Sequence, residues 1–188
     1  MLRADAILAL LDSRSFSSIW FWLLVMLAWS LAGRRVLGVP QDVISAVERP
    51  APANPDDPAA IMLLDWLSLT LPRWRLRPRE GAVLVGVAAF LFSGLAILGF
   101  GYGLEMAQAL LLLALPFAAI FGLEMRLAGR LRALLQQAEA GMAPNVAGAE
   151  AARLMQRHRL LVLALSVLAV TVIAFYAALW MILNPFPF

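Results

Sequence analysis

Four stretches of this chain carry no charged side chain, and they constrain its fold more than any other feature of the sequence. They comprise residues 15–33, 81–104, 106–123 and 160–188. An α-helix rises 1.5 Å per residue, so about 20 apolar residues cross a hydrocarbon core of roughly 30 Å. The four stretches meet or approach that length. We therefore expect an all-α integral membrane protein with four transmembrane helices, at 15–33, 81–102, 104–123 and 160–183.

The composition agrees with a membrane location, because 63% of the residues are hydrophobic and only 14% are charged. A chain of 188 residues has room for one membrane bundle and short loops, but not for a separate catalytic domain. We therefore expect a single membrane domain over 1–188.

The basic residues predict the orientation of the spans. All 15 are arginines, of which two precede the first span, seven lie in 34–80, six lie in 124–159, and none lies elsewhere. The positive-inside rule places both arginine-rich loops in the cytoplasm. The membrane is expected to be a bacterial inner membrane with both termini on its periplasmic side. Residues 1–14 are expected to form a short amphipathic helix along the membrane interface. The arginines predict contact with anionic lipid rather than nucleic acid.

The two loops differ in character. The first contains a short potential helix at 41–49, a proline-rich connector at 50–58, and an apolar segment at 61–71 that is too short to span and is expected to lie at the interface or pack on the bundle. The second continues helix three beyond 123 and returns after a tip marked by Gly141, Pro144 and Gly148. It predicts a cytoplasmic helical stalk at 124–159, with leucines 127, 131, 134 and 135 on one face as a docking surface.

The sequence offers few residues that could bind a cofactor. The chain has no cysteine, which excludes disulfides, zinc-thiolate sites and cysteine-held iron-sulfur clusters. The single histidine, His158, leaves open a haem with one ligand, while an interfacial histidine without a cofactor is the expected case. No phosphate loop, metal motif or nucleophile elbow is present, so we expect no enzyme and no cofactor.

Glu105 is the one acidic residue within the apolar region, and Gln108 follows on the same helical face. A carboxylate inside a membrane is a candidate proton relay or ion ligand. The alternative is a carboxylate in the first turn of helix three, near the interface, where it complements the helix dipole. The remaining candidate residues are expected to contact lipid or a partner: Trp20, Trp22, Arg34, Arg35, Arg73, Arg75, Arg77, Arg126, Arg130 and His158.

Two segments resemble a family of small bacterial four-span proteins labelled "component of SufBCD complex". One is LDSRSFSSIWFW at 11–22, continuing through 29–40 to the sequence VLGVP, and the other is 99–116 with its EMAQA at 105–109. The resemblance implies a link to iron-sulfur assembly, in which a chain without cysteine would act as a membrane tether.

These observations favour a non-catalytic accessory or scaffold subunit of a larger inner-membrane complex, respiratory or photosynthetic, that binds other integral membrane proteins through its aromatic-rich spans and its stalk. Two alternatives are the small membrane subunit of a secondary transporter, by analogy of span count alone, and an independent ion pathway through Glu105 and Gln108.

Overall fold

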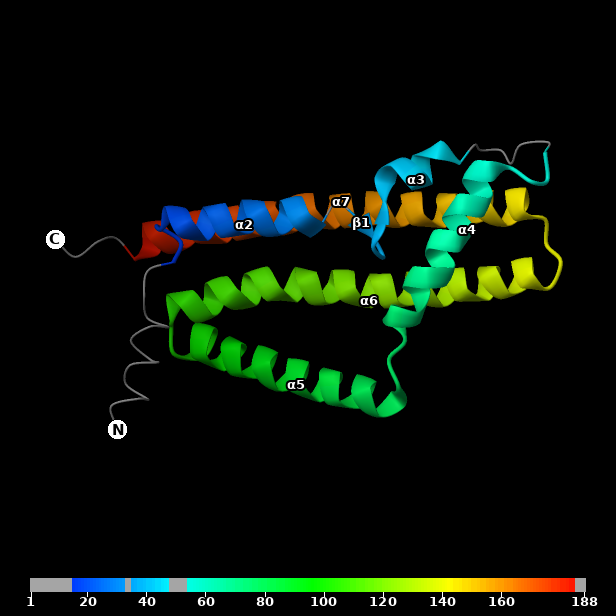
Figure 1. Ribbon diagram of the computed structural model, residues 1–188. Helices are drawn as coiled ribbons and strands as arrows, with labels where there is room; N and C mark the ends of the chain where they lie inside the picture. Colours follow the sequence, from blue (N-terminus) through cyan, green and yellow to red (C-terminus); the bar gives the residue numbers. More distant parts are fainter. Residues whose placement is uncertain (1–14, 33–34, 48–53, 185–188) are drawn as a thin grey trace. The chain divides into compact units, whose positions relative to one another are not determined.

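The computed structural model describes residues 15–32, 35–47 and 54–184, and helices dominate this part of the chain (Figure 1). The expected interfacial helix at 1–14 lies outside the described residues. The helices are α2 (Ile19–Ala32), α3 (Gln41–Ala46), α4 (Pro58–Thr70), α5 (Pro78–Ala96), α6 (Glu105–Glu139) and α7 (Pro144–Leu183). A 3-10 turn, η1 (Leu71–Trp74), follows α4, and a π-helical turn, η2 (Ile97–Gly101), ends α5.

Three helices are long and apolar enough to cross a membrane: α5 with η2, α6 and α7. The protein therefore has the helices of a multi-pass membrane protein. Helix α2 has 14 residues, which is about 21 Å at 1.5 Å per residue, and it begins after a turn at 15–18. A fourth complete span at 15–33 is thus not shown.

The contacts divide the expected single domain into two compact units. Unit 1 contains the described residues of 15–29, 76–118 and 165–184, and unit 2 contains those of 30–75 and 119–164. The helices α6 and α7 each contribute one part to each unit. The continuation of helix three beyond 123, which the sequence predicted, is confirmed by the length of α6.

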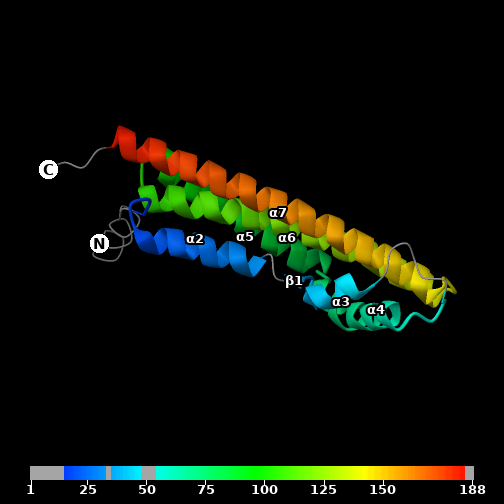
Figure 2. The same cartoon turned by 90° about the horizontal axis from the view of Figure 1, so that it is seen from above.

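Unit 2 has a hydrophobic core that joins the first loop to the stalk. Within it, Figure 1 shows α4 crossing α6 and α7, and Figure 2 shows α3 and α4 together beside these two helices. Leucines of α4 and α6 meet valines of the first loop in this core. The leucine face of the stalk, expected as a docking surface, is buried in this core, because the first loop of the same chain covers it. Buried residues of the core include Val36, Leu37, Val39, Ile44, Leu63, Leu67, Leu127, Leu131, Leu134 and Met155.

A small hairpin, which the sequence did not predict, opens the first loop. Strands β1 (Arg35–Val36) and β2 (Val39–Pro40) pair antiparallel through a turn at Leu37 and Gly38. Both turn residues have positive φ, 53° and 85°, as the tight turns favoured in hairpins require. Leucine adopts such a φ at a steric cost. Burial of the Leu37 side chain in the core of unit 2 offsets this cost.

Helix α4 begins where the proline-rich connector ends. The carboxylate of Asp57 accepts a hydrogen bond from the Ala60 N–H at 3.1 Å, and Pro58 occupies the first turn, where its missing N–H costs nothing. The connector is held to the stalk by a hydrogen bond from the Asn145 N–H to the Pro55 carbonyl. The segment expected at 61–71 is thus a helix that packs on unit 2 through Leu63, Leu64 and Leu67.

One tip residue was assigned wrongly from the sequence. Gly141 has φ +110° and makes the turn, and Pro144 starts α7, as expected. Gly148 instead lies inside α7, beneath α4, where a Cβ atom would stand 2.5 Å from the Cβ of Ala60 and 2.8 Å from its Cα. This glycine is required by close helix packing and not by a turn.

Candidate functional site

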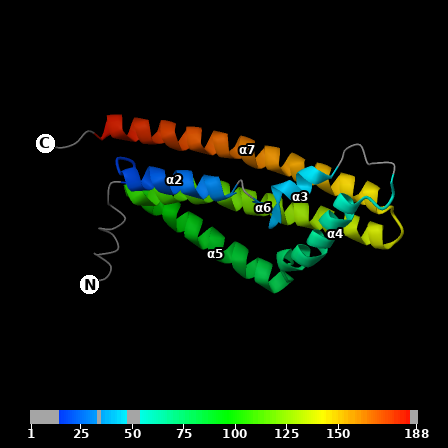
Figure 3. The same ribbon diagram turned by 45° about the horizontal axis from the view of Figure 1, so that its top comes forward.

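The polar centre of unit 1 lies where α2 and α6 begin and α7 ends (Figure 3). Glu105 is the first residue of α6, and only 8% of its surface is exposed. Its Oε1 accepts a hydrogen bond from the backbone N–H of Phe16 at 2.5 Å, and its Oε2 accepts one from the indole N–H of Trp180 at 3.2 Å. Each carboxyl oxygen therefore has an N–H donor.

The two residues that donate to Glu105, Phe16 and Trp180, belong to a cluster of aromatic side chains. The ring of Phe16 is buried and makes edge contacts with Phe21 and Tyr176, and Tyr176 stacks on Trp180. The indole N–H of Trp22 donates to the Phe16 carbonyl at 3.0 Å. Both backbone polar groups of Phe16 are thereby satisfied by side chains, which fixes the turn before α2 onto α6 and α7.

Gln108 lies one turn further along α6 and is 2% exposed. Its Nε2 donates to the Gly99 carbonyl at 2.7 Å. A Cβ atom on Gly99 would lie 2.9 Å from the Gln108 backbone nitrogen, so only glycine permits this approach. Gly99 thus serves close packing, while Gly103, with φ +75°, makes the turn before α6. The Oε1 of Gln108 is buried without a hydrogen-bond partner.

This arrangement supports a structural reading of Glu105. The residue stands in the first turn of its helix, as one of the two interpretations required. Its two carboxyl oxygens are met by N–H groups of the protein, one from Phe16 and one from Trp180. Among the described residues, no group of three potential metal ligands occurs. The hydrogen bonds of Glu105 join α6 to α7 and to the turn before α2.

The tryptophans that the sequence singled out have different environments. Trp20 is 76% exposed on α2, whereas Trp22 is half-buried and serves the Phe16 turn. Trp29, at the other end of α2, stacks on Phe117 with ring centroids 4.8 Å apart. Of these three residues, Trp20 is the one that offers a surface to lipid or a partner.

The arginine candidates are exposed wherever their side chains are described: Arg73, Arg75, Arg77, Arg126 and Arg130. Arg34 lies outside the described residues, and of Arg35 only the backbone is described. Arg153 pairs with Glu150 at 2.6 Å, at the i, i+3 spacing of side chains on one helix face. The exposed arginines fit the predicted contact with acidic lipid headgroups.

His158 is buried within the protein, which does not fit the lipid or partner contact expected for it. The residue precedes the uncharged stretch 160–188 and lies in unit 2, where only 5% of its surface is exposed. Burial lowers the pKa of its imidazole below the ordinary 6.5, because the charged form loses hydration. A neutral, buried His158 serves packing rather than lipid contact.

Sequence reasoning named Glu105 and Gln108 but missed the residues that hold them. Phe16 and Trp180 lie 89 and 75 residues from Glu105 in the chain. The aromatic residues near the ends of the uncharged stretches were the available signal. No family model matches the chain, and no curated protein or solved structure shows a significant match to it.

Proposed function

We propose that this protein is a non-catalytic accessory subunit that binds a larger integral membrane protein in the bacterial inner membrane. Its termini lie in the periplasm and its arginine-rich segments in the cytoplasm, as the positive-inside rule requires. The polar groups at the centre of unit 1 support this class of function, because their hydrogen bonds hold helices together.

One observation carries the proposal. Helix α5 is apolar and long enough, with η2, to cross a membrane, yet none of its 19 residues is buried. By contrast, α6 and α7 each bury several residues within their own chain. A span that contacts so little of its own protein has its surface available to lipid or to another membrane protein.

The face that α5 presents favours a protein partner. Ala82, Gly86, Ala89 and Ser93 recur at spacings of four, three and four residues and therefore share one side of the helix. All four are exposed, and a Cβ atom on Gly86 would meet nothing within 4 Å. Small residues let the backbones of two membrane helices approach closely, and such contacts drive helix association in lipid. We assign this small-residue face of α5 as the contact with the partner span.

The test replaces Gly86 by leucine and measures which proteins co-purify with the chain in mild detergent. Overpacking a close helix contact costs about 1–3 kcal/mol, which corresponds to a roughly 5- to 150-fold loss of partner. The matched control is Gly81→Leu, the same change about 140° around the helix, where a Cβ atom also meets nothing. Equal partner recovery with both variants would contradict the assignment.

Cysteine labelling tests the orientation and the contact together. Because the chain has no cysteine of its own, a thiol reagent labels it only at the cysteine that is introduced. Ala143→Cys at the tip between α6 and α7 is expected to react only with reagents that reach the cytoplasm, and Tyr102→Cys only with periplasmic reagents. Ser93→Cys is expected to cross-link to the partner span.

The identity of the recovered partner distinguishes the related proposals. A respiratory or photosynthetic complex supports the accessory subunit in its expected form. A many-span transport protein indicates the small subunit of a secondary transporter. Recovery of iron-sulfur assembly proteins supports a membrane tether, as the resemblance of residues 11–40 implies. Recovery of the chain alone, without any partner, would refute the whole class.

A further inference from the structure

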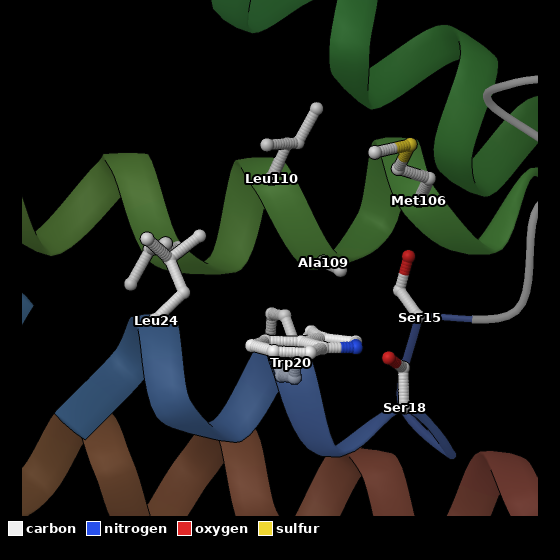
Figure 4. A pocket seen from close by; sticks show the side chains of 9 residues that line it. Ser15, Ser18, Trp20, Leu24, Met106, Ala109 and Leu110 are labelled. Atoms are coloured by element: carbon white, nitrogen blue, oxygen red, sulfur yellow. The ribbon is translucent and has the colours of Figure 1, made fainter. Parts of the chain in front are cut away.

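Unit 1 contains a cavity of about 250 Å³ between α2 and α6 (Figure 4). Seven of its nine lining residues are apolar or aromatic, and none is charged. The two polar ones, Ser15 and Ser18, lie together at the end where α2 and α6 begin. We propose that this cavity binds one acyl chain of a membrane glycerolipid, with the lipid's ester region at the two serines.

The surroundings of the cavity determine what can enter it. Trp20 and Leu24 line it and are exposed, and Leu24 points from α2 toward α6. In a protein whose helices cross a membrane, exposed apolar side chains of this kind face hydrocarbon. A cavity that opens among them meets lipid chains and not water, and hydrocarbon is as apolar as its leucine walls.

The size of the cavity favours a flexible chain over a helix as its occupant. An α-helix with its side chains is about 10 Å wide, so the span of a second copy could place only side chains in a space of about 250 Å³. The lining from Met106 to Leu113 runs roughly 10 Å along α6 at 1.5 Å per residue. A single acyl chain can lie along this length.

The polarity of the cavity indicates which part of a lipid it recognises. Hydroxyl groups occur only at the end next to Glu105, where the uncharged stretch 106–123 starts and the membrane boundary is expected. Serine hydroxyls donate to the ester carbonyl oxygens that lie at this depth. Because no charged side chain lines the cavity, it recognises the acyl chain and the ester group of the lipid and not the charge of the headgroup.

The experiment reconstitutes the full chain into vesicles of zwitterionic phosphatidylethanolamine in which a fraction carries a photoreactive group on one acyl chain. Peptide mass spectrometry then maps the cross-links. We expect them to concentrate on residues 20–24 and 106–113. Leu24→Trp fills the cavity and is expected to reduce these cross-links at least fivefold. The matched control is Leu23→Trp, an adjacent leucine of equal exposure (48% against 49%) that does not line the cavity, and it is expected to leave them unchanged.

Further measurements on the same vesicles can refute the proposal. Ser18→Ala, which removes the hydroxyl and leaves the Cβ in place, is expected to lower cross-linking of the ester-bearing lipid but not of a photoreactive alkane without an ester. Cross-links spread evenly over all exposed apolar residues would overturn the proposal, as would equal labelling of the Leu23 and Leu24 variants. Displacement of the labelled lipid by an isoprenoid, but not by unlabelled glycerolipid, would also overturn it. Partner binding through α5 is a separate matter, because Leu24→Trp leaves Gly86 unchanged.

Discussion

Replacing Gly148 by alanine measures how closely α4 packs on α7 in unit 2. The new Cβ atom would lie 2.5 Å from the Cβ of Ala60, 2.8 Å from its Cα and 3.3 Å from its carbonyl oxygen. Two of these three atoms belong to the backbone, so no side-chain rotation relieves the clash. The helix α4 must move away from α7, which loosens the core around Leu63 and Leu67.

Two contributions of opposite sign determine how much Gly148→Ala changes the free energy of unfolding. Overpacking of a tight contact costs about 1–3 kcal/mol, while alanine stabilises a helix interior by about 0.8–1.0 kcal/mol relative to glycine. The control Gly129→Ala, in α6, gains the same propensity without a clash, because a Cβ atom there meets nothing within 4 Å. The difference between the two variants therefore isolates the packing term, and we expect Gly148→Ala to be the less stable by about 1–3 kcal/mol.

Hydrogen exchange in mild detergent, followed peptide by peptide, is the appropriate assay because it separates the two units. Amides of α4 are expected to exchange faster in Gly148→Ala than in Gly129→Ala, by a factor of roughly 5 to 150 for an opening free energy lowered by 1–3 kcal/mol. Amides of α5, in unit 1, serve as the internal reference. Equal exchange of α4 in the two variants would show that the contact between Gly148 and Ala60 is not close, and the account of the core of unit 2 would fail with it.

Two further predictions concern the buried polar residues. Glu105→Gln replaces one acceptor oxygen by an amino group that faces an N–H donor, either that of Phe16 or that of Trp180. We therefore expect a loss of about 1–3 kcal/mol of stability and faster hydrogen exchange of the Phe16 amide. A large loss of ion flux with unchanged stability would instead support the alternative of an ion pathway. The pKa of His158 is lowered in the folded state, so the unfolded chain binds the proton more readily. The stability of unit 2 should therefore fall as the pH drops below about 6.5 and through the folded-state pKa. His158→Gln should remove that part of the pH dependence, and a thermal-unfolding profile identical to that of the unmodified protein between pH 7 and pH 5 would contradict the assignment.

The helices were predictable because their signals are local. An uncharged run of sufficient length specifies a span from its own residues, and the leucine spacing beyond 123 extended helix three into the continuous α6. The position of Glu105 in the first turn of α6 follows from the same run, since the charge marks where the run is interrupted. The pair of Glu150 and Arg153 has the i, i+3 spacing at which side chains of one helix meet.

The core of unit 2 could not be predicted in the same way. Residues 34–80 appear in the sequence as a connector with two short apolar segments, and their burial depends on the stalk helices that arrive some 80 residues later. The hairpin at 35–40 has strands of only two residues each, too short to show a period. Its turn places a leucine at positive φ, which local propensity disfavours and which only the surrounding core stabilises.

The sequence by itself determined that this protein has long apolar helices, which of its segments are basic, and that cysteine chemistry is absent, because length, charge and composition are properties of the chain alone. The tertiary structure decided what the polar and small residues do. Glu105 holds Phe16 and Trp180 across 89 and 75 residues of sequence, and Gly148 admits Ala60 of a helix from the other loop. Such contacts join residues that are distant in the chain, so their geometry exists only once the helices have packed.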